Sequence, residues 1–106
     1  LGSNLLTYTG TTRTFKISVN VSWANAGNTP ATFSLAIWKN GVTVTSSPIR
    51  ATLDDSTISY PRNCSTECLV SLATNDTVSP AITCLTTTDN AIIVDLSFNI
   101  VEIRWE

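Results

Sequence analysis

The stretch that decides the fold is Phe15-Lys16-Ile17-Ser18-Val19-Asn20-Val21-Ser22-Trp23. Apolar and polar residues alternate along it without a break. Successive side chains of a β-strand point to opposite faces, so this period of two is typical of a strand with one face on the core and one on water. The stretch therefore predicts a long, half-buried strand. Its inward face carries Phe15, Ile17, Val19, Val21 and Trp23, and its outward face carries Lys16, Ser18, Asn20 and Ser22.

The residues that follow predict a turn, a second strand and a hairpin. Asn25 to Pro30 is a cluster of turn-forming residues. Phe33, Leu35 and Ile37 then form the next inward set, and Trp38 falls out of phase with them, so it should face the other side. Asn40-Gly41 comes next and is the preferred pair for a tight type I′ turn, because both central residues need a positive φ. We expect a β-hairpin at this position.

The second half of the chain continues the pattern less regularly. We predict a short strand at Ile49 to Leu53, two strands at 69–72 and 78–85 around an Asn75-Asp76 turn, and another turn at 86–90. The last run is predicted to be inward at Ile92, Val94, Leu96, Phe98 and Ile100, and the phase then changes to Val101, Ile103 and Trp105. A phase change without a turn signal indicates a β-bulge or burial on both faces.

Seven or eight short strands in about a hundred residues predict one all-β domain over residues 1–106, an antiparallel two-sheet jelly-roll sandwich with little or no helix. The 12 Ser and 18 Thr of the chain fit pleated surfaces. The net charge is −2 and the basic residues are scattered singly, so we expect no nucleic-acid partner. No apolar run approaches the roughly 18 residues that span a bilayer, so we expect no membrane insertion.

The residue types that carry catalysis are poorly represented. The chain has no His, which removes Ser-His-Asp and Cys-His arrangements and the usual zinc ligand sets, and no pattern pairs the carboxylates across a cleft. We therefore predict no catalytic residue, no metal site, no cofactor and no enzymatic activity. Asp54-Asp55 has two readings, a Ca²⁺ site and a solvated turn, and the turn is favoured.

Three cysteines and three glycosylation sequons are present. Cys64 and Cys68 lie close together in the sequence, and we predict a disulfide between them. A bond from Cys84 to either of them is the alternative, because an odd count leaves one thiol over. The sequons begin at Asn20, Asn63 and Asn75 and are about as frequent as chance would give, so they are not evidence of glycosylation.

Several short motifs in a fixed order give the chain a family resemblance. They are Tyr8-Thr9-Gly10 before an alternating strand, the hairpin Lys39-Asn40-Gly41, the turn Leu72-Ala73-Thr74-Asn75-Asp76-Thr77-Val78, and a terminal apolar run that includes Val101 and Ile103. Together they resemble the viral and phage fibre head domains of the C1q/tumour-necrosis-factor-like jelly-roll type. The chain departs from that pattern at Asn75, where the family has Gly; Asn is the next best residue for positive φ. The Cys64-x-x-x-Cys68 insert is a further departure. The family usually has another strand before the segment at Tyr8, and its absence here suggests that the N-terminal strand is short or lies in a missing part of the parent chain.

The resemblance implies a homotrimer on the virion surface or another extracellular location, formed by the C-terminal part of a longer fibre protein and attached to a host cell-surface protein or glycan. The first alternative is a structural trimerisation or decoration domain of a capsid or tail that binds no receptor. The second is a cellular C1q-like or carbohydrate-binding module.

Two sets of residues are the predicted contact sites. The trimer interface is expected at Trp38, Val101, Ile103 and Trp105, because a small, weakly charged domain with apolar residues on both phases of its last strand has surface left to bury. Trp38 has an equal alternative reading as an exposed binding anchor. Receptor binding is expected on the irregular connection from Ser56 to Glu67, through Tyr60, Arg62 and Asn63.

Overall fold

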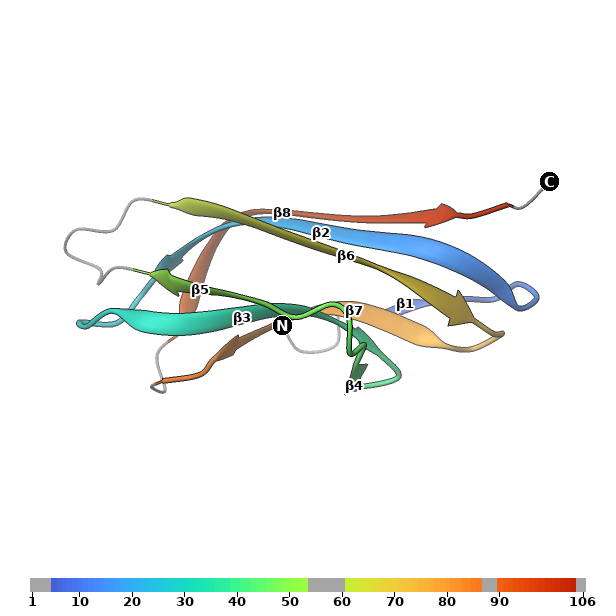
Figure 1. The fold of residues 1–106 in the computed structure, drawn as a ribbon, viewed down its shortest axis with the longest axis horizontal. Helices are drawn as coiled ribbons and strands as arrows, with labels where there is room; N and C mark the ends of the chain where they lie inside the picture. Colours follow the sequence, from blue (N-terminus) through green and yellow to red (C-terminus); the bar gives the residue numbers. More distant parts are fainter. Residues whose placement is uncertain (1–4, 54–60, 87–89, 105–106) are drawn as a thin grey trace.

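The computed structural model describes residues 5–53, 61–86 and 90–104 and contains two antiparallel sheets packed face to face (Figure 1). Every strand pairing in it is antiparallel. Among these residues there is no helix, and so none that is long and apolar enough to cross a membrane. The predicted all-β, two-sheet sandwich is confirmed. The molecule is elongated, with principal extents of 50 × 25 × 21 Å.

The three-stranded sheet has the order β6-β2-β8, and its central strand contains the alternating stretch from Phe15 to Trp23. The central strand β2 (Arg13–Asn25) pairs with β6 (Arg62–Leu72) along one edge and with β8 (Ala91–Glu102) along the other. The inward residues predicted for β2 are all buried, and the strand is longer than the alternating run because Arg13 and Asn25 extend it at either end.

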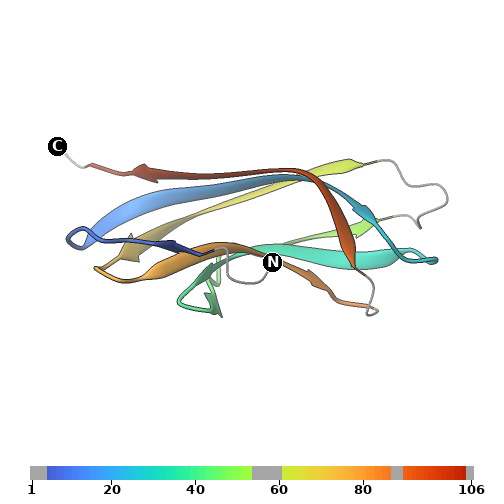
Figure 2. The same ribbon diagram turned by 180° about the vertical axis from the view of Figure 1, so that it is seen from behind.

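The five-stranded sheet lies beneath it and has the order β1-β7-β3-β4, with β5 also paired to β3. Its members are β1 (Leu6–Thr7), β3 (Ala31–Lys39), β4 (Val42–Thr43), β5 (Ile49–Leu53) and β7 (Thr77–Cys84). Seen from behind, β1 runs beside β7, and β8 follows the edge of the upper layer before it bends toward the lower one (Figure 2).

The core fills the space between the two sheets. Trp23 from β2 and Phe33 from β3 are both fully buried, and their ring centroids lie 5.9 Å apart. Burying side chains of this size is the main source of stability in such a domain. The other buried apolar residues of the core are Phe15, Ile17, Val19, Val21, Ala31, Leu35, Ile37, Leu53, Cys68, Leu72 and Val78.

The predicted turns adopt the backbone conformations that their sequences require. Asn40 and Gly41 have φ values of 52° and 78°, and Lys39 pairs with Val42 across them, so the tight hairpin is confirmed. Asn75 has φ of 74°, which is the left-handed conformation expected of a residue that replaces Gly. Buried Asn25 stabilises the first turn: its Nδ2 donates to the carbonyl of Thr29, and its Oδ1 accepts from the Gly27 amide.

The last strand corrects the predicted phase. The register shifts once, between Ser22 and Trp23: Ser22 lies opposite Asp95 and Trp23 opposite Ile93, so Val94 is the extra residue of a β-bulge. The bulge therefore lies at Val94, and the register is regular from Asp95 to Glu102. Phe98 and Ile100 pack against the core as predicted. Ile92, Val94 and Leu96 do not; they are exposed, and Ala91 and Ile93 pack against the core instead.

The segment that precedes the Asn75-Asp76 turn also differs from the prediction. Residues 62–67 were predicted to belong to an irregular connection, yet they form the first half of β6, which pairs with β2 over its whole length from Arg62 to Leu72. The alternation is present here, but its inward members Cys64 and Thr66 are small or polar, so it is weak as a hydrophobic signal. Long-range pairing with β2 decides the structure of this segment.

Candidate functional site

Three of the four motifs that carry the family resemblance meet at one end of the sandwich. Asn40, at the tip of the β3–β4 hairpin, reaches the β6–β7 turn: its Nδ2 donates to Asp76 Oδ1 at 2.9 Å, and its Oδ1 accepts from the Thr77 amide at 2.9 Å. On the other side, the Tyr8 amide donates to the Asp76 carbonyl at 2.9 Å, and the Asn75 amide donates to the Tyr8 carbonyl at 2.7 Å. Three segments far apart in the chain are thus joined by hydrogen bonds.

Asp76 is the centre of this junction. Its Oδ2 accepts from the Ala73 amide at 2.8 Å and lies 3.6 Å from Lys39 Nζ. The hydrogen bond from Ala73 is the main reason that the pKa of Asp76 lies below its ordinary value, and the hydrogen bond from Asn40 lowers it further. Burial opposes this shift, and the charge of Lys39 adds to it. The side-chain polar atoms of Asn40 and Asp76 are all paired within the chain, so we interpret the junction as structural.

The residues predicted for a trimer interface lie on different faces of the sandwich. Trp38 is 38% exposed on the outer face of the five-stranded sheet, opposite Ser79 and Thr43. Val101 is 56% exposed on the outer face of the three-stranded sheet, opposite Lys16. Ile103 follows β8, is half-buried, and donates its amide proton to Thr14; Trp105 lies outside the described residues.

Val101 has an apolar neighbour that the sequence did not single out. Leu69 on β6 is 58% exposed and pairs with Lys16 from the other side, so Leu69, Lys16 and Val101 form one row across the three-stranded sheet. The Lys16 ammonium is 3.3 Å from Glu67 Oε2, one step along the sheet. The aliphatic stem of Lys16 lies between the apolar side chains of Leu69 and Val101. We call this row of three residues the apolar bar.

The residues predicted to bind a receptor are only partly placed. Tyr60 lies outside the described residues. Arg62 begins β6 opposite Trp23, and its neighbour Asn63 lies on the outer face opposite Ser22. The structure therefore separates Arg62 from Asn63 by the pleat of the strand, and brings Asn63 into a new neighbourhood.

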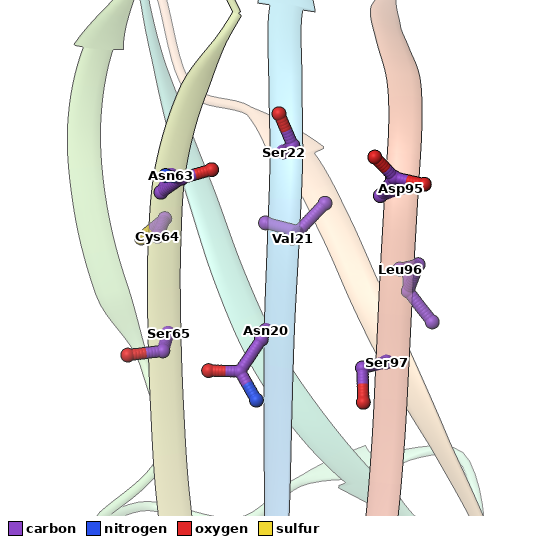
Figure 3. Close-up of a pocket in the computed structure, with 9 residues that line it drawn as sticks. All are labelled: Asn20, Val21, Ser22, Asn63, Cys64, Ser65, Asp95, Leu96 and Ser97. Atoms are coloured by element: carbon purple, nitrogen blue, oxygen red, sulfur yellow. The ribbon is translucent and has the colours of Figure 1, made fainter.

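That neighbourhood is a shallow polar hollow of about 610 Å³ on the outer face of the three-stranded sheet (Figure 3). Two rows of side chains cross the three strands in register. One row is Asn63, Ser22 and Asp95, and the next is Ser65, Asn20 and Ser97. All three strands of the sheet thus contribute two polar side chains each. Of these six residues, only Asn63 was predicted as a site residue.

The signal for the other residues was present in the sequence but incomplete. Asn20 and Ser22 occupy the outward phase of the alternating stretch, so their exposure was predictable. Asp95 and Ser97 also fall in the predicted outward phase of the last run, because Leu96 and Phe98 were predicted to be inward. Ser65 was missed because it lies on a segment that was not recognised as a strand. Pairing register across the sheet, which no local pattern encodes, brings the six together.

The predicted disulfide between Cys64 and Cys68 is wrong. Both residues are free thiols on the single strand β6, four positions apart. Four residues of strand extend roughly 13 Å, while a disulfide needs Cα atoms about 4.4–6.8 Å apart. Both thiols face the core, and burial raises the pKa of each. Cys84 also packs against the core, from β7 of the other sheet.

Neither metal-ligating side chains nor known relatives identify a function for this surface. Among residues 5–53, 61–86 and 90–104, no three side chains of His, Cys, Asp or Glu group in a way that could hold a metal ion. The Asp54-Asp55 pair lies outside these residues. No protein-family model, no curated protein and no solved structure matches the chain.

Proposed function

We propose that this chain is the trimeric head domain of a viral or phage fibre, of the C1q/tumour-necrosis-factor-like jelly-roll type, and that it attaches the particle to a host surface. The observation that supports the proposal is the junction at Asp76. The family resemblance rests on four motifs that follow one another in a fixed order along the chain. In the structure three of these motifs, those of Tyr8, Asn40 and Asp76, contact one another through hydrogen bonds.

Strand order is consistent with the same proposal. The chain passes from one sheet to the other five times: between β1 and β2, between β2 and β3, between β5 and β6, between β6 and β7, and between β7 and β8. Repeated crossing between two sheets is typical of Greek-key sandwiches, the class to which jelly rolls belong, so these crossings support the proposal at the level of that class.

The geometry of the exposed apolar residues favours one trimer surface over the other. A ring of three identical subunits needs two contact patches inclined toward one axis, whereas patches on opposite faces build an open chain. Trp38 and Val101 are on opposite faces of the sandwich and so do not belong to one closed ring. The proposed axis therefore runs beside the apolar bar of Leu69, Lys16 and Val101, and Trp38 faces outward.

The polar hollow is the proposed attachment surface. It contains Asn63, which the sequence assigned to receptor binding, and it lies on the same sheet face as the apolar bar but nearer the start of β6. Asn20 and Val101 are separated along the face by the row of Ser18 and Asn99. Attachment through a scaffold held by three long strands needs little ordering on binding.

Two measurements on the purified chain test the proposal. Light scattering at high concentration should give the mass of a trimer. The same material, added in excess, should compete with intact particles for adsorption to cells of the host. A monomer that does not compete refutes the proposal, and a trimer that does not compete favours the purely structural alternative.

A further inference from the structure

The polar side chains of the hollow are unoccupied by internal contacts. Among the described residues, the side chains of Asn20, Ser22, Asn63, Ser65 and Asp95 make no hydrogen bond, and only Ser97 accepts one, from Asn99 Nδ2 at 2.9 Å. In contrast, the polar side chains at the Asp76 junction are joined to one another. Two amides, two hydroxyls and a carboxylate thus have their donors and acceptors available to a ligand.

The charge of the hollow restricts the ligand class. Asp95 is the one charged residue that lines it, and no Lys or Arg does. A carboxylate without a cation repels phosphates, sulfates and acidic sugars, and it accepts hydrogen bonds from hydroxyl groups. The complementary ligand is neutral and rich in hydroxyls.

The dimensions fit the same class. Neighbouring strands lie about 4.8 Å apart, so each row of three side chains spans roughly 10 Å, and the two rows are separated by two residues, or roughly 7 Å. This footprint suits one or two sugar rings lying flat on the sheet. A peptide strand would need an open sheet edge for its backbone, but the hollow is centred on β2, whose two edges are both paired.

We propose that the hollow binds a neutral glycan of the host surface, with Asp95 and Asn63 at the two ends of one row and Asn20 at the centre of the other. This inference rests on the proposed attachment function and names its ligand class. Ser22 and Asn20, on the central strand, contact the middle of the glycan. Asp95 accepts from adjacent hydroxyls, and the amides of Asn20 and Asn63 both donate and accept.

The site binds each glycan weakly. No aromatic side chain lines the hollow, so the stacking that strengthens many sugar sites is missing. Its apolar lining residues are Val21, Cys64 and Leu96. Three hollows on one trimer compensate through effective concentration, which raises avidity over single-site affinity by about two orders of magnitude or more. The trimer should therefore bind a glycan-coated surface far better than it binds the free sugar.

The first experiment identifies the ligand class. The intact chain is applied to an array of neutral and acidic glycans, and the strongest neutral glycan is then titrated into ¹⁵N-labelled protein. We expect neutral glycans to be bound over acidic ones and the shifted amides to cluster at 20–22, 63–65 and 95–97. Binding of acidic glycans only, of no glycan, or with shifts elsewhere on the molecule overturns the inference.

Matched variants test the residues. Ser22→Ala should weaken binding of the neutral glycan about three- to tenfold, as the loss of one neutral hydrogen bond does. Ser18→Ala is the control, because Ser18 lies on the same strand and face but outside the hollow. The double variant Asn20→Ala with Asn63→Ala should abolish binding. Equal effects of Ser22→Ala and Ser18→Ala, or unchanged binding by the double variant, contradict the assignment.

Adsorption to host cells separates failure of this inference from failure of the proposed function. If the trimer adsorbs and the double variant adsorbs equally well, attachment stands and the glycan site is refuted. If adsorption is abolished by protease treatment of the cells and is insensitive to periodate oxidation of their glycans, the partner is a protein and the inference is again refuted. Loss of adsorption on periodate treatment, together with loss in the double variant, supports both.

Discussion

Polar side chains in this chain are either paired inside the molecule or left with their hydrogen-bonding atoms available, and their hydrogen bonds distinguish the two groups. Asn40 and Asp76 use both of their side-chain polar atoms inside the molecule, so they hold segments together. Asn20 and Asn63 use none within the described residues. The same residue type is therefore structural in one place and available for binding in another, and only the surroundings decide which.

Asp76 predicts a stability that depends on acid. Its folded-state pKa is depressed, so its contribution is complete above the ordinary aspartate value of about 3.9 and is lost as the pH falls through the lower folded-state pKa. Asp76→Asn should be less stable than the parent chain at pH 7, and the difference should shrink toward zero below the folded-state pKa. Urea midpoints at pH 7, 4 and 2.5 measure this; a difference that does not change with pH contradicts it. Asp95→Asn is the control, because Asp95 makes no such hydrogen bonds.

At the scale of the element, the position of one extra residue controls a whole strand. The bulge at Val94 moves Ile93 and Ala91 onto the core and leaves Ile92 exposed. Without it, β8 would continue the phase of Phe98 and Ile100, and Val94 and Ile92 would face inward. The bulge also accompanies the bend of β8 toward the lower sheet, which Figures 1 and 2 both show.

The β3–β4 hairpin gives a prediction about the backbone alone. Gly41 has φ of 78°, and outside its two chain neighbours no atom lies within 4 Å of the position that a Cβ would occupy. Gly41→Ala should therefore destabilise the fold by about 1–2 kcal/mol through its left-handed conformation, with no steric contribution. Gly41→Asn should cost clearly less, because Asn tolerates that conformation. Equilibrium unfolding in urea compares the two, and equal costs would show that the conformation is not the cause.

At the scale of the whole molecule, the outer faces of the two sheets carry different exposed side chains. The three-stranded sheet carries the apolar bar at one end and the polar hollow toward the other, on one continuous face. The five-stranded sheet carries Trp38 outward. The proposed trimer and the proposed glycan site therefore share a sheet without using the same residues, and a change in one can be tested for its effect on the other.

Exposed valines on the two sheets test the trimer surface. Val101→Glu places a carboxylate in the apolar bar and should convert the trimer to a monomer in light scattering, because an unpaired charge is costly to bury at an interface. Val42→Glu is the matched control: Val42 is 68% exposed on β4 of the other sheet, and its variant should stay trimeric. Dissociation by Val42→Glu with no effect of Val101→Glu would transfer the interface to the five-stranded sheet.

Much of the fold was predictable, and the failures share one cause. The inward faces of β2 and β3, the Asn40-Gly41 hairpin and the positive φ of Asn75 were all predicted correctly. The phase of β8 before the bulge at Val94, the first half of β6 and the disulfide of Cys64 were not. The correct predictions depend on neighbours in the chain, and the wrong ones on partners in space.

The sequence by itself determined which side of each regular strand faces the core and where the chain turns, because alternation and positive φ arise from local sterics and local hydrophobicity. Only the tertiary structure decided the register. Backbone hydrogen bonding is nearly the same for strands slipped by two residues, so the packing of Trp23, Phe33 and their neighbours selects one pairing. That pairing places Asn63 and Asp95 on either side of Ser22, and it joins Asn40 to Asp76. The polar hollow and the Asp76 junction therefore exist because long-range packing selected the alignment of strands whose faces were already set.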